Sequence, residues 1–181
     1  MRLKHGALCF TLLLASKAAM ALSIPPAGTE GLLVTVATDG DVIATFQGYS
    51  ALYSDDLIVN GNVVFNNKTT ATGTSVNLGS FTAGTVLDFS LLVNKTGNTF
   101  YSGDGSLNSD GKAHVRVQNE WAPTTTLVSF EDLDHGKFDY NDLVFSFSNT
   151  VAAPAVPVPG AAWLFGSGIL GLAAARRRKR S

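Results

Sequence analysis

The central part of this 181-residue chain is predicted to be all-β, folded as an antiparallel β-sandwich or jelly roll. Short apolar runs, several of them alternating with polar residues, recur between residues 22 and 150 with turn-forming residues between them. The same section carries no apolar stripe with the capping residues of a helix. Many short strands within one domain favour these two architectures.

Eight strands are expected, each placed on one apolar run. They cover residues 32–37, 42–47, 57–59, 63–65, 86–93, 113–117, 125–130 and 143–147. Asn60 and Gly61 lie between two of these runs, and because both residue types tolerate a positive φ, a tight hairpin is expected there. Residues 151–159 are rich in proline, alanine and valine, which predicts an extended linker after the domain, whose bounds are residues 22–150.

Charges are sorted along the chain. Of the 13 Lys and Arg residues, three lie in the first 21 residues and five in the last six, whereas all 14 acidic residues lie between these ends with the other five basic ones. The middle section therefore has a net charge of about −9, which repels nucleic acid and attracts divalent cations. Nucleic acid is not an expected partner. Cys9 precedes this section, so neither disulfides nor thiolate metal sites are expected in it.

Residues 1–21 have the three parts of a signal peptide and are predicted to form a signal helix. Arg2 and Lys4 are its basic start, residues 7–15 are its apolar stretch, and Ala19 and Ala21 are the small residues that signal peptidase reads. Cleavage is expected after Ala21. The alternative is a membrane anchor, but the apolar stretch is short for a span.

Residues 160–181 are predicted to form a transmembrane helix with a basic tail. The apolar run covers residues 161–175, and five basic residues follow it. Basic clusters stay on the cytoplasmic side, where a signal peptide also begins, so the middle section is expected to cross the inner membrane. Three glycines suit this helix to close packing on another helix, such as that of a processing enzyme. The alternative is a tail-anchored protein that keeps its helix.

This C-terminal arrangement resembles the PEP-CTERM sorting signal of Gram-negative bacteria. The residues that carry the resemblance are Val156, Pro157, Pro159, Trp163, Arg176, Arg177 and Arg178. The sequence departs from the signal at Val158, where the Pro-Glu-Pro core has glutamate, which leaves the cleavage position open. The resemblance implies processing by a membrane exosortase, transient contact with the inner membrane, and a final place at the cell surface or outside the cell, associated with exopolysaccharide or biofilm matrix.

Acidic side chains are most concentrated in residues 130–145. Five carboxylates and one asparagine fall within 12 residues, and the single Lys137 cannot balance them. Crowded anions repel one another unless a cation lies among them, and Ca²⁺ takes six to eight oxygen ligands. Gly136 could supply the turn. The candidate ligands are Glu131, Asp132, Asp139, Asn141 and Asp142, with Asp134 as a second choice.

The spacing of these residues is not that of an EF-hand, because Leu143 stands where the twelfth-position glutamate belongs. Alternation along a strand would place Asp139 and Asn141 on one face and Tyr140 and Asp142 on the other. A loop or bulge is therefore needed for the ligands to converge. The alternative is a solvated acidic turn whose side chains bond the local backbone.

The same segment is similar to the Phe-Glu-Asp-Leu … Asp-Tyr-Asn-Asp-Leu-Val-Phe signature of a bacterial extracellular domain family of uncharacterised function. That family often accompanies PEP-CTERM tails or occurs in large calcium-rich surface proteins. Members usually carry Gly-Gly-Asp before the second half, where this chain has His135, Gly136 and Lys137. The resemblance implies a calcium site. Acidic turns elsewhere could supply distal ligands, although a plain turn is expected for each: Asp39 and Asp41, Asp55 and Asp56, and Asn108 and Asp110.

The chain is not expected to be an enzyme. The Gly-x-Ser-x-Gly pattern of a serine nucleophile is absent from the sequence, and His114 fits a strand pattern as a structural or surface residue. The expected function is that of a calcium-stabilised structural or adhesive protein of the cell surface. The alternatives are a polysaccharide-active enzyme and a carbohydrate-binding module, for which packing is still the expected role of the candidate aromatics Tyr49, Tyr53, Phe100, Tyr101 and Trp121.

Overall fold

The computed structural model describes residues 28–154, which form twelve strands and one short 3₁₀ helix. Within that range no helix is long and apolar enough to cross a membrane. The expected signal helix of residues 1–21, the sorting motif and the transmembrane helix of residues 160–181 lie outside the described residues.

The strands are short and follow one another along the chain. The first six are β1 (Thr29–Glu30), β2 (Leu32–Val36), β3 (Gly40–Gly48), β4 (Asp55–Val59), β5 (Asn62–Asn66) and β6 (Ser75–Phe81). The others are β7 (Phe89–Val93), β8 (Thr99–Tyr101), β9 (Val115–Ala122), β10 (Thr125–Phe130), β11 (Leu143–Ser148) and β12 (Thr150–Pro154), with the 3₁₀ helix η1 (Gly105–Leu107) between β8 and β9.

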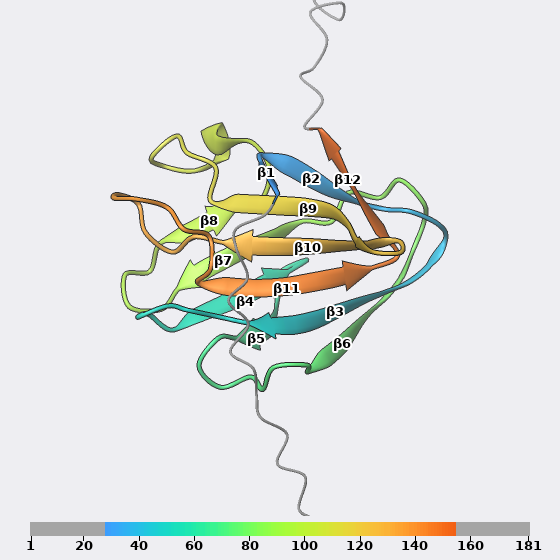
Figure 1. The fold of residues 1–181 in the computed structure, drawn as a ribbon, viewed down its shortest axis with the longest axis horizontal. Helices are drawn as coiled ribbons and strands as arrows, with labels where there is room; N and C mark the ends of the chain where they lie inside the picture. Colours follow the sequence, from blue (N-terminus) through green and yellow to red (C-terminus); the bar gives the residue numbers. More distant parts are fainter. Residues whose placement is uncertain (1–27, 155–181) are drawn as a thin grey trace, which may run out of the picture.

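All strand pairings are antiparallel, and the strands form two main layers. One layer is a six-stranded sheet in the order β1-β9-β10-β11-β3-β6, and the other is a four-stranded sheet in the order β5-β4-β7-β8. Figure 1 shows the four-stranded sheet behind the six-stranded one, and β2 beside β12 as a small third sheet. The predicted all-β class is therefore confirmed, with a sandwich-like arrangement of antiparallel sheets.

Phenylalanine side chains fill the space between the two layers. Phe89 of β7 points from the four-stranded sheet into a group from the other sheet, with ring centroids 6.0 Å from Phe130, 5.9 Å from Phe145 and 5.4 Å from Phe147. All four rings are buried. Since removing a side chain of this size from water contributes about 1.5–3 kcal/mol, these rings are a main source of stability.

The predicted hairpin at Asn60 and Gly61 is confirmed. It joins β4 to β5, and both residues have positive φ, 49° and 78°, as a two-residue hairpin turn of this type requires.

Four strands lie where none was expected, and two expected elements differ. Besides β1, β6 and β8, residues 151–154 of the expected linker are extended but form most of β12, which pairs with β2. The strand expected from Val86 begins at Phe89, because Val86 makes only an isolated bridge with Thr35 of β2.

Candidate metal centre

The acidic loop, residues 131–142, connects β10 to β11 at one end of the sandwich, the end on the left in Figure 1. The two strands pair without interruption from Thr125 opposite Ser148 to Phe130 opposite Leu143. The Asp142 N–H donates to Phe130 O at 3.1 Å, which continues the pairing into the loop. The antiparallel register thus brings the first and last carboxylates of the loop together.

Three carboxylates of this loop converge. One oxygen from each of Glu131, Asp139 and Asp142 lies within 4.8 Å of the other two. Glu131 and Asp142 are buried, whereas Asp139 is exposed. A set of carboxylate oxygens at this spacing could hold a metal ion, and such oxygen-only donors suit a hard cation.

Two residues with positive φ turn the backbone of the loop, so that carboxylates that a straight strand would hold apart can converge. Gly136 has a φ of 100° and Tyr140 a φ of 54°, so the alternation expected of a strand is broken between Asp139 and Asp142. Tyr140 is held in this conformation by its hydroxyl, which donates to Ala113 O at 3.0 Å, and by the Arg116 guanidinium, 4.0 Å from the ring centroid. Nothing in the residue pattern pointed to this turn at Tyr140.

Glu131 is the centre around which the loop folds. Its Oε2 accepts from the Asp139 N–H at 2.8 Å and the Tyr140 N–H at 3.3 Å, and its Oε1 accepts from the Leu133 N–H at 3.3 Å. In the same way, Asp142 Oδ2 accepts from the Asp132 N–H at 2.9 Å. These contacts fix the carboxylates before any ion binds.

The remaining candidate ligands of the loop differ in their surroundings. Asp132 is 5% exposed and its Oδ2 has no hydrogen-bond partner, and the buried Oδ1 of Asn141 also has none. Asp134 lies at the exposed tip of the loop, where its carboxylate pairs with His135. The structure therefore brings together Glu131, Asp139 and Asp142, leaves unpaired oxygens on Asp132 and Asn141, and places Asp134 outside the cluster.

A fourth buried acid reaches the loop from the opposite sheet. Asp55, the first residue of β4, is fully buried, and its Oδ1 has no hydrogen-bond partner. The fully buried Asn67 fixes it: the Asn67 Nδ2 donates to Asp55 Oδ2 at 2.6 Å and to Asp142 O at 3.3 Å. The sequence indicated Asp55 only as one of several turn acids.

The other turn acids stay apart from the loop cluster. Asp39 Oδ1 accepts from the Ala83 N–H at 2.7 Å, and Asp41 accepts from Asn77 at 2.8 Å and from Ser80. Both acids thus bind residues 36 to 44 positions further along the chain, which differs from the plain turn expected for them.

Burial raises the pKa of three carboxyl groups at this end of the fold. Burial raises the pKa of Asp55 to about 7, and the charge of Asp132 acts in the same direction. Burial also raises the pKa of Asp142 to about 8, although the hydrogen bond from the Asp132 N–H acts to lower it. The pKa of Asp132 is raised too, first by burial and then by the charge of Glu131. A divalent ion could take the place of these protons, because a positive charge in the site favours the ionised carboxylates.

His114 contacts the backbone at the start of the acidic loop. It is fully buried and stacked on Phe100, with ring centroids 3.6 Å apart. Its Nδ1 contacts Glu131 O at 3.0 Å, and its Nε2 contacts Asp110 Oδ2 at 3.1 Å. His114 is therefore a positioning residue for the backbone of Glu131, in line with the structural role expected for it.

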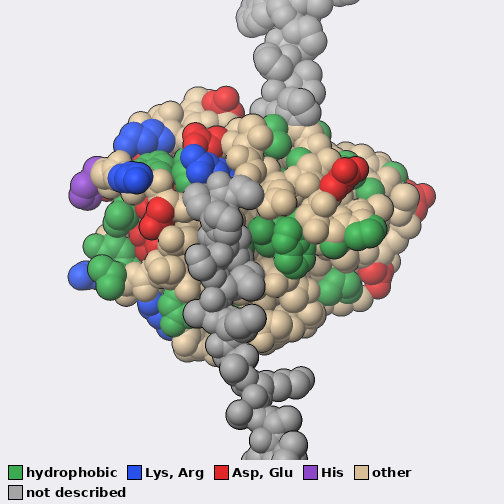
Figure 2. All heavy atoms as spheres, in the orientation of Figure 1, with side chains coloured by type: hydrophobic (Ala, Val, Ile, Leu, Met, Phe, Trp, Pro, Cys, Tyr) green, Lys and Arg blue, Asp and Glu red, His purple; other side chains and the backbone are tan. Residues whose placement is uncertain are grey.

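The cluster opens to solvent through a hollow of about 160 Å³. Its wall includes Ser50, Leu52 and Tyr53 from the segment after β3, and Lys137 from the loop. On the face seen in Figure 2, the Lys and Arg side chains gather toward this same end of the molecule. Several of them lie over aromatic rings instead of pointing into the acids, as with Lys68, 4.5 Å from the centroid of Tyr49.

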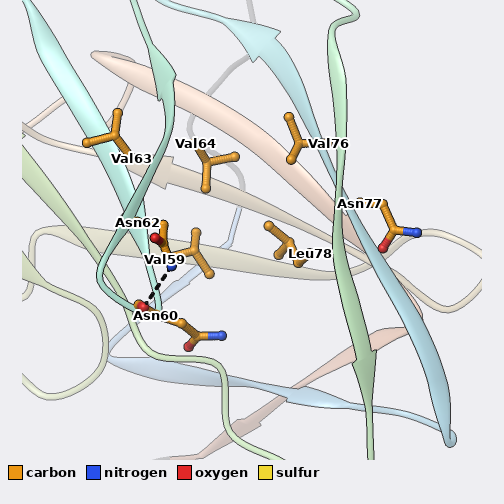
Figure 3. Close-up of a pocket in the computed structure, with 8 residues that line it drawn as sticks. All are labelled: Val59, Asn60, Asn62, Val63, Val64, Val76, Asn77 and Leu78. Carbon is orange, nitrogen blue, oxygen red and sulfur yellow. Dashed lines mark hydrogen bonds between the residues drawn. The ribbon is translucent and has the colours of Figure 1, made fainter.

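A larger hollow, of about 310 Å³, lies between the outer strands β5 and β6 and is shown in Figure 3. Valine and leucine side chains line it together with three asparagines, Asn60, Asn62 and Asn77. None of its lining residues has a titratable side chain, so it differs from the acidic hollow at the loop.

The aromatic residues considered for sugar stacking are dispersed over the fold. Phe100 is buried, whereas Tyr49, Tyr101 and Trp121 are exposed on different elements. Tyr49 stacks on Phe46, with ring centroids 6.4 Å apart, in line with the packing role expected for it.

No family model and no curated protein matches this chain. The fold and the site therefore define its class: an all-β domain of antiparallel sheets with a largely buried carboxylate cluster that could hold a metal ion.

Proposed function

We propose that this protein is a calcium-stabilised structural or adhesive component of the cell surface or extracellular matrix. The observation that supports the proposal most directly is the convergence of Glu131, Asp139 and Asp142 within 4.8 Å at the end of the sandwich. Two of these carboxylates are buried, and burying anions together is costly unless a cation compensates them.

Calcium is the proposed ion because all the available ligand atoms are oxygens. The cluster consists of carboxylates, with the unpaired Oδ1 of Asn141 as a further potential ligand. Such a set suits Ca²⁺, which accepts six to eight oxygens in irregular geometry, better than Mg²⁺, which demands an octahedron and keeps its waters. Extracellular calcium modules bind at about 10⁻⁴–10⁻³ M, and the proposed location is one where such affinity suffices.

The ion would stabilise the domain by mass action, since it binds the folded loop and not the unfolded chain. At an ion concentration of about 100 times the Kd, this adds about 2.7 kcal/mol to the free energy of unfolding. Its role would be to fix the end of the sandwich, and the protein is proposed to act by binding and scaffolding, with no catalytic step.

The test is a thermal melt of the full-length chain, kept in mild detergent, in millimolar calcium and in chelator. We expect calcium to raise Tm by roughly 5–10 °C. Combining Asp139→Asn with Asp142→Asn should abolish the rise. Asp88→Asn, which removes one exposed carboxylate outside the cluster, should keep it. Identical melts of the unmodified protein in both buffers would exclude the calcium site.

Export and processing form a separate part of the proposal, supported by the two ends of the sequence. We expect the protein to lose its N-terminal segment on export and its C-terminal tail afterwards, through exosortase. Replacing Arg176, Arg177 and Arg178 with alanine should leave a larger, membrane-associated form. Gel mobility and cell fractionation measure both events, and an unmodified protein found intact in the cytoplasm would contradict them.

A further inference from the structure

Two buried acids from opposite sheets meet beside the loop cluster. Asp55 begins β4 of the four-stranded sheet, and Asp132 follows β10 of the six-stranded sheet. The charge of Asp132 is among the causes that raise the pKa of Asp55, so the two carboxyl groups are close neighbours. Asp55 is fully buried and Asp132 is 5% exposed, so water cannot compensate either of them well.

Each of these carboxyl groups carries one oxygen without a partner. They are Asp55 Oδ1 and Asp132 Oδ2, both buried. The other oxygen of Asp55 accepts from Asn67 Nδ2 at 2.6 Å, so the free oxygen is not the result of a loosely held side chain. An unsatisfied buried acceptor costs about 1–3 kcal/mol, and more when it is charged, so two neighbouring ones call for a shared positive partner.

Together, the loop cluster and this acid pair hold more carboxyl groups than one divalent ion compensates when all of them are ionised. Asp55 and Asp132 lie next to the converging carboxylates Glu131, Asp139 and Asp142, which makes five acids in one place. One divalent ion compensates two of the five charges. Lys68 attracts both Asp55 and Asp132, but its ammonium donates to Ala51 O and lies over the ring of Tyr49. A second divalent ion would compensate two more of these charges.

We propose that a second divalent cation of the Ca²⁺ type binds between Asp55 and Asp132 and joins the two sheets. Its ligands come from both layers of the sandwich, whereas those of the loop site all come from the acidic loop. Asp132 directly follows Glu131, so the two ions would share one stretch of backbone. This second site is independent of export, and its ligand pair is distinct from the three carboxylates of the proposed function.

The experiment is a count of calcium ions bound to the full-length chain at pH 7.5, by native mass spectrometry and by titration calorimetry. The unmodified protein is expected to bind two ions. Asp55→Asn should remove one of them and leave the loop site, and Asp139→Asn should remove the other. Asp56→Asn is the matched control, because Asp56 lies on the opposite face of the same strand and accepts from Asn66; this variant should still bind two.

The count separates the second site from the loop site. One ion in the unmodified protein, lost in Asp139→Asn but kept in Asp55→Asn, would overturn the second site while leaving the proposed function intact, and the acid pair would then share a proton. Two ions retained by Asp55→Asn would also overturn it. No bound ion at all would overturn both sites. If Asp55→Asn fails to fold, the count on the unmodified protein still decides, since a single ion refutes the proposal.

Discussion

Asn67 is the residue that ties the acidic loop to the opposite sheet. Its Oδ1 accepts from the Asp55 N–H at 2.9 Å, and its Nδ2 donates to Asp55 Oδ2, to Tyr53 O at 3.2 Å and to Asp142 O. All of these groups lie in or near the buried end of the sandwich. One amide side chain therefore satisfies polar groups from two segments of the chain, residues 53–55 and the acidic loop.

Replacing Asn67 with alanine is expected to destabilise the domain by about 2–4 kcal/mol, because it leaves a buried N–H and a buried carboxylate oxygen without partners. Urea denaturation in chelator measures this cost without the contribution of an ion. The control is Asn94→Ala. Asn94 is exposed, and its side chain makes one long contact, 3.4 Å, with the Ser54 hydroxyl. That variant should change stability by less than about 0.5 kcal/mol. Equal effects of the two substitutions would refute the bridging role.

At the scale of single elements, the strands that the sequence predicts are those with a continuous or alternating apolar run. β3, β10 and β11 are buried on at least one face and were expected within two residues of their observed bounds. β6 escapes prediction because it is an edge strand whose exposed positions are serine, asparagine and glycine, and only Val76, Leu78 and Phe81 turn inward. β8 has three residues and β1 two, too few to show a period.

The acidic loop was predictable where its chemistry is local and unpredictable where it depends on the partner sheet. Glu131, Asp139 and Asp142 lie within twelve residues, so their crowding is visible in the sequence. Asp55 and Asn67 join them only because the four-stranded sheet packs against the six-stranded sheet, which brings together residues far apart in the chain. Local charge density therefore indicates a site, but its full set of ligands is decided by how the layers pack.

At the scale of the whole molecule, burying the aromatic core also buries carboxyl groups at the acidic end, and their ionised forms are unfavourable there. The sheets must close over Asp55, Asp132 and Asp142 to bury the aromatic core, and closing them removes water from the three carboxyl groups. Without an ion, burial raises the pKa of all three carboxyl groups, which favours their protonated forms. With an ion, the same carboxyl groups ionise and the positive charge compensates them. Protons and calcium are thus alternative ways to stabilise one arrangement.

This competition predicts how stability depends on pH. The pKa values of Asp55 and Asp142, about 7 and about 8 in the folded protein, exceed the ordinary value of 3.8, so the folded state binds more protons than the unfolded state between these limits. Stability in chelator should therefore be greatest at the acidic side of this window and fall as pH rises through 7 and 8. We expect Tm in chelator to drop by at least about 5 °C from pH 5 to pH 8, and to drop much less in millimolar calcium, whose affinity grows as the protons leave. Asp55→Asn, which cannot titrate, should flatten the decline in chelator. A protein that is more stable in chelator at pH 8 than at pH 5 would show that these carboxyl groups are ionised in the folded state without any ion.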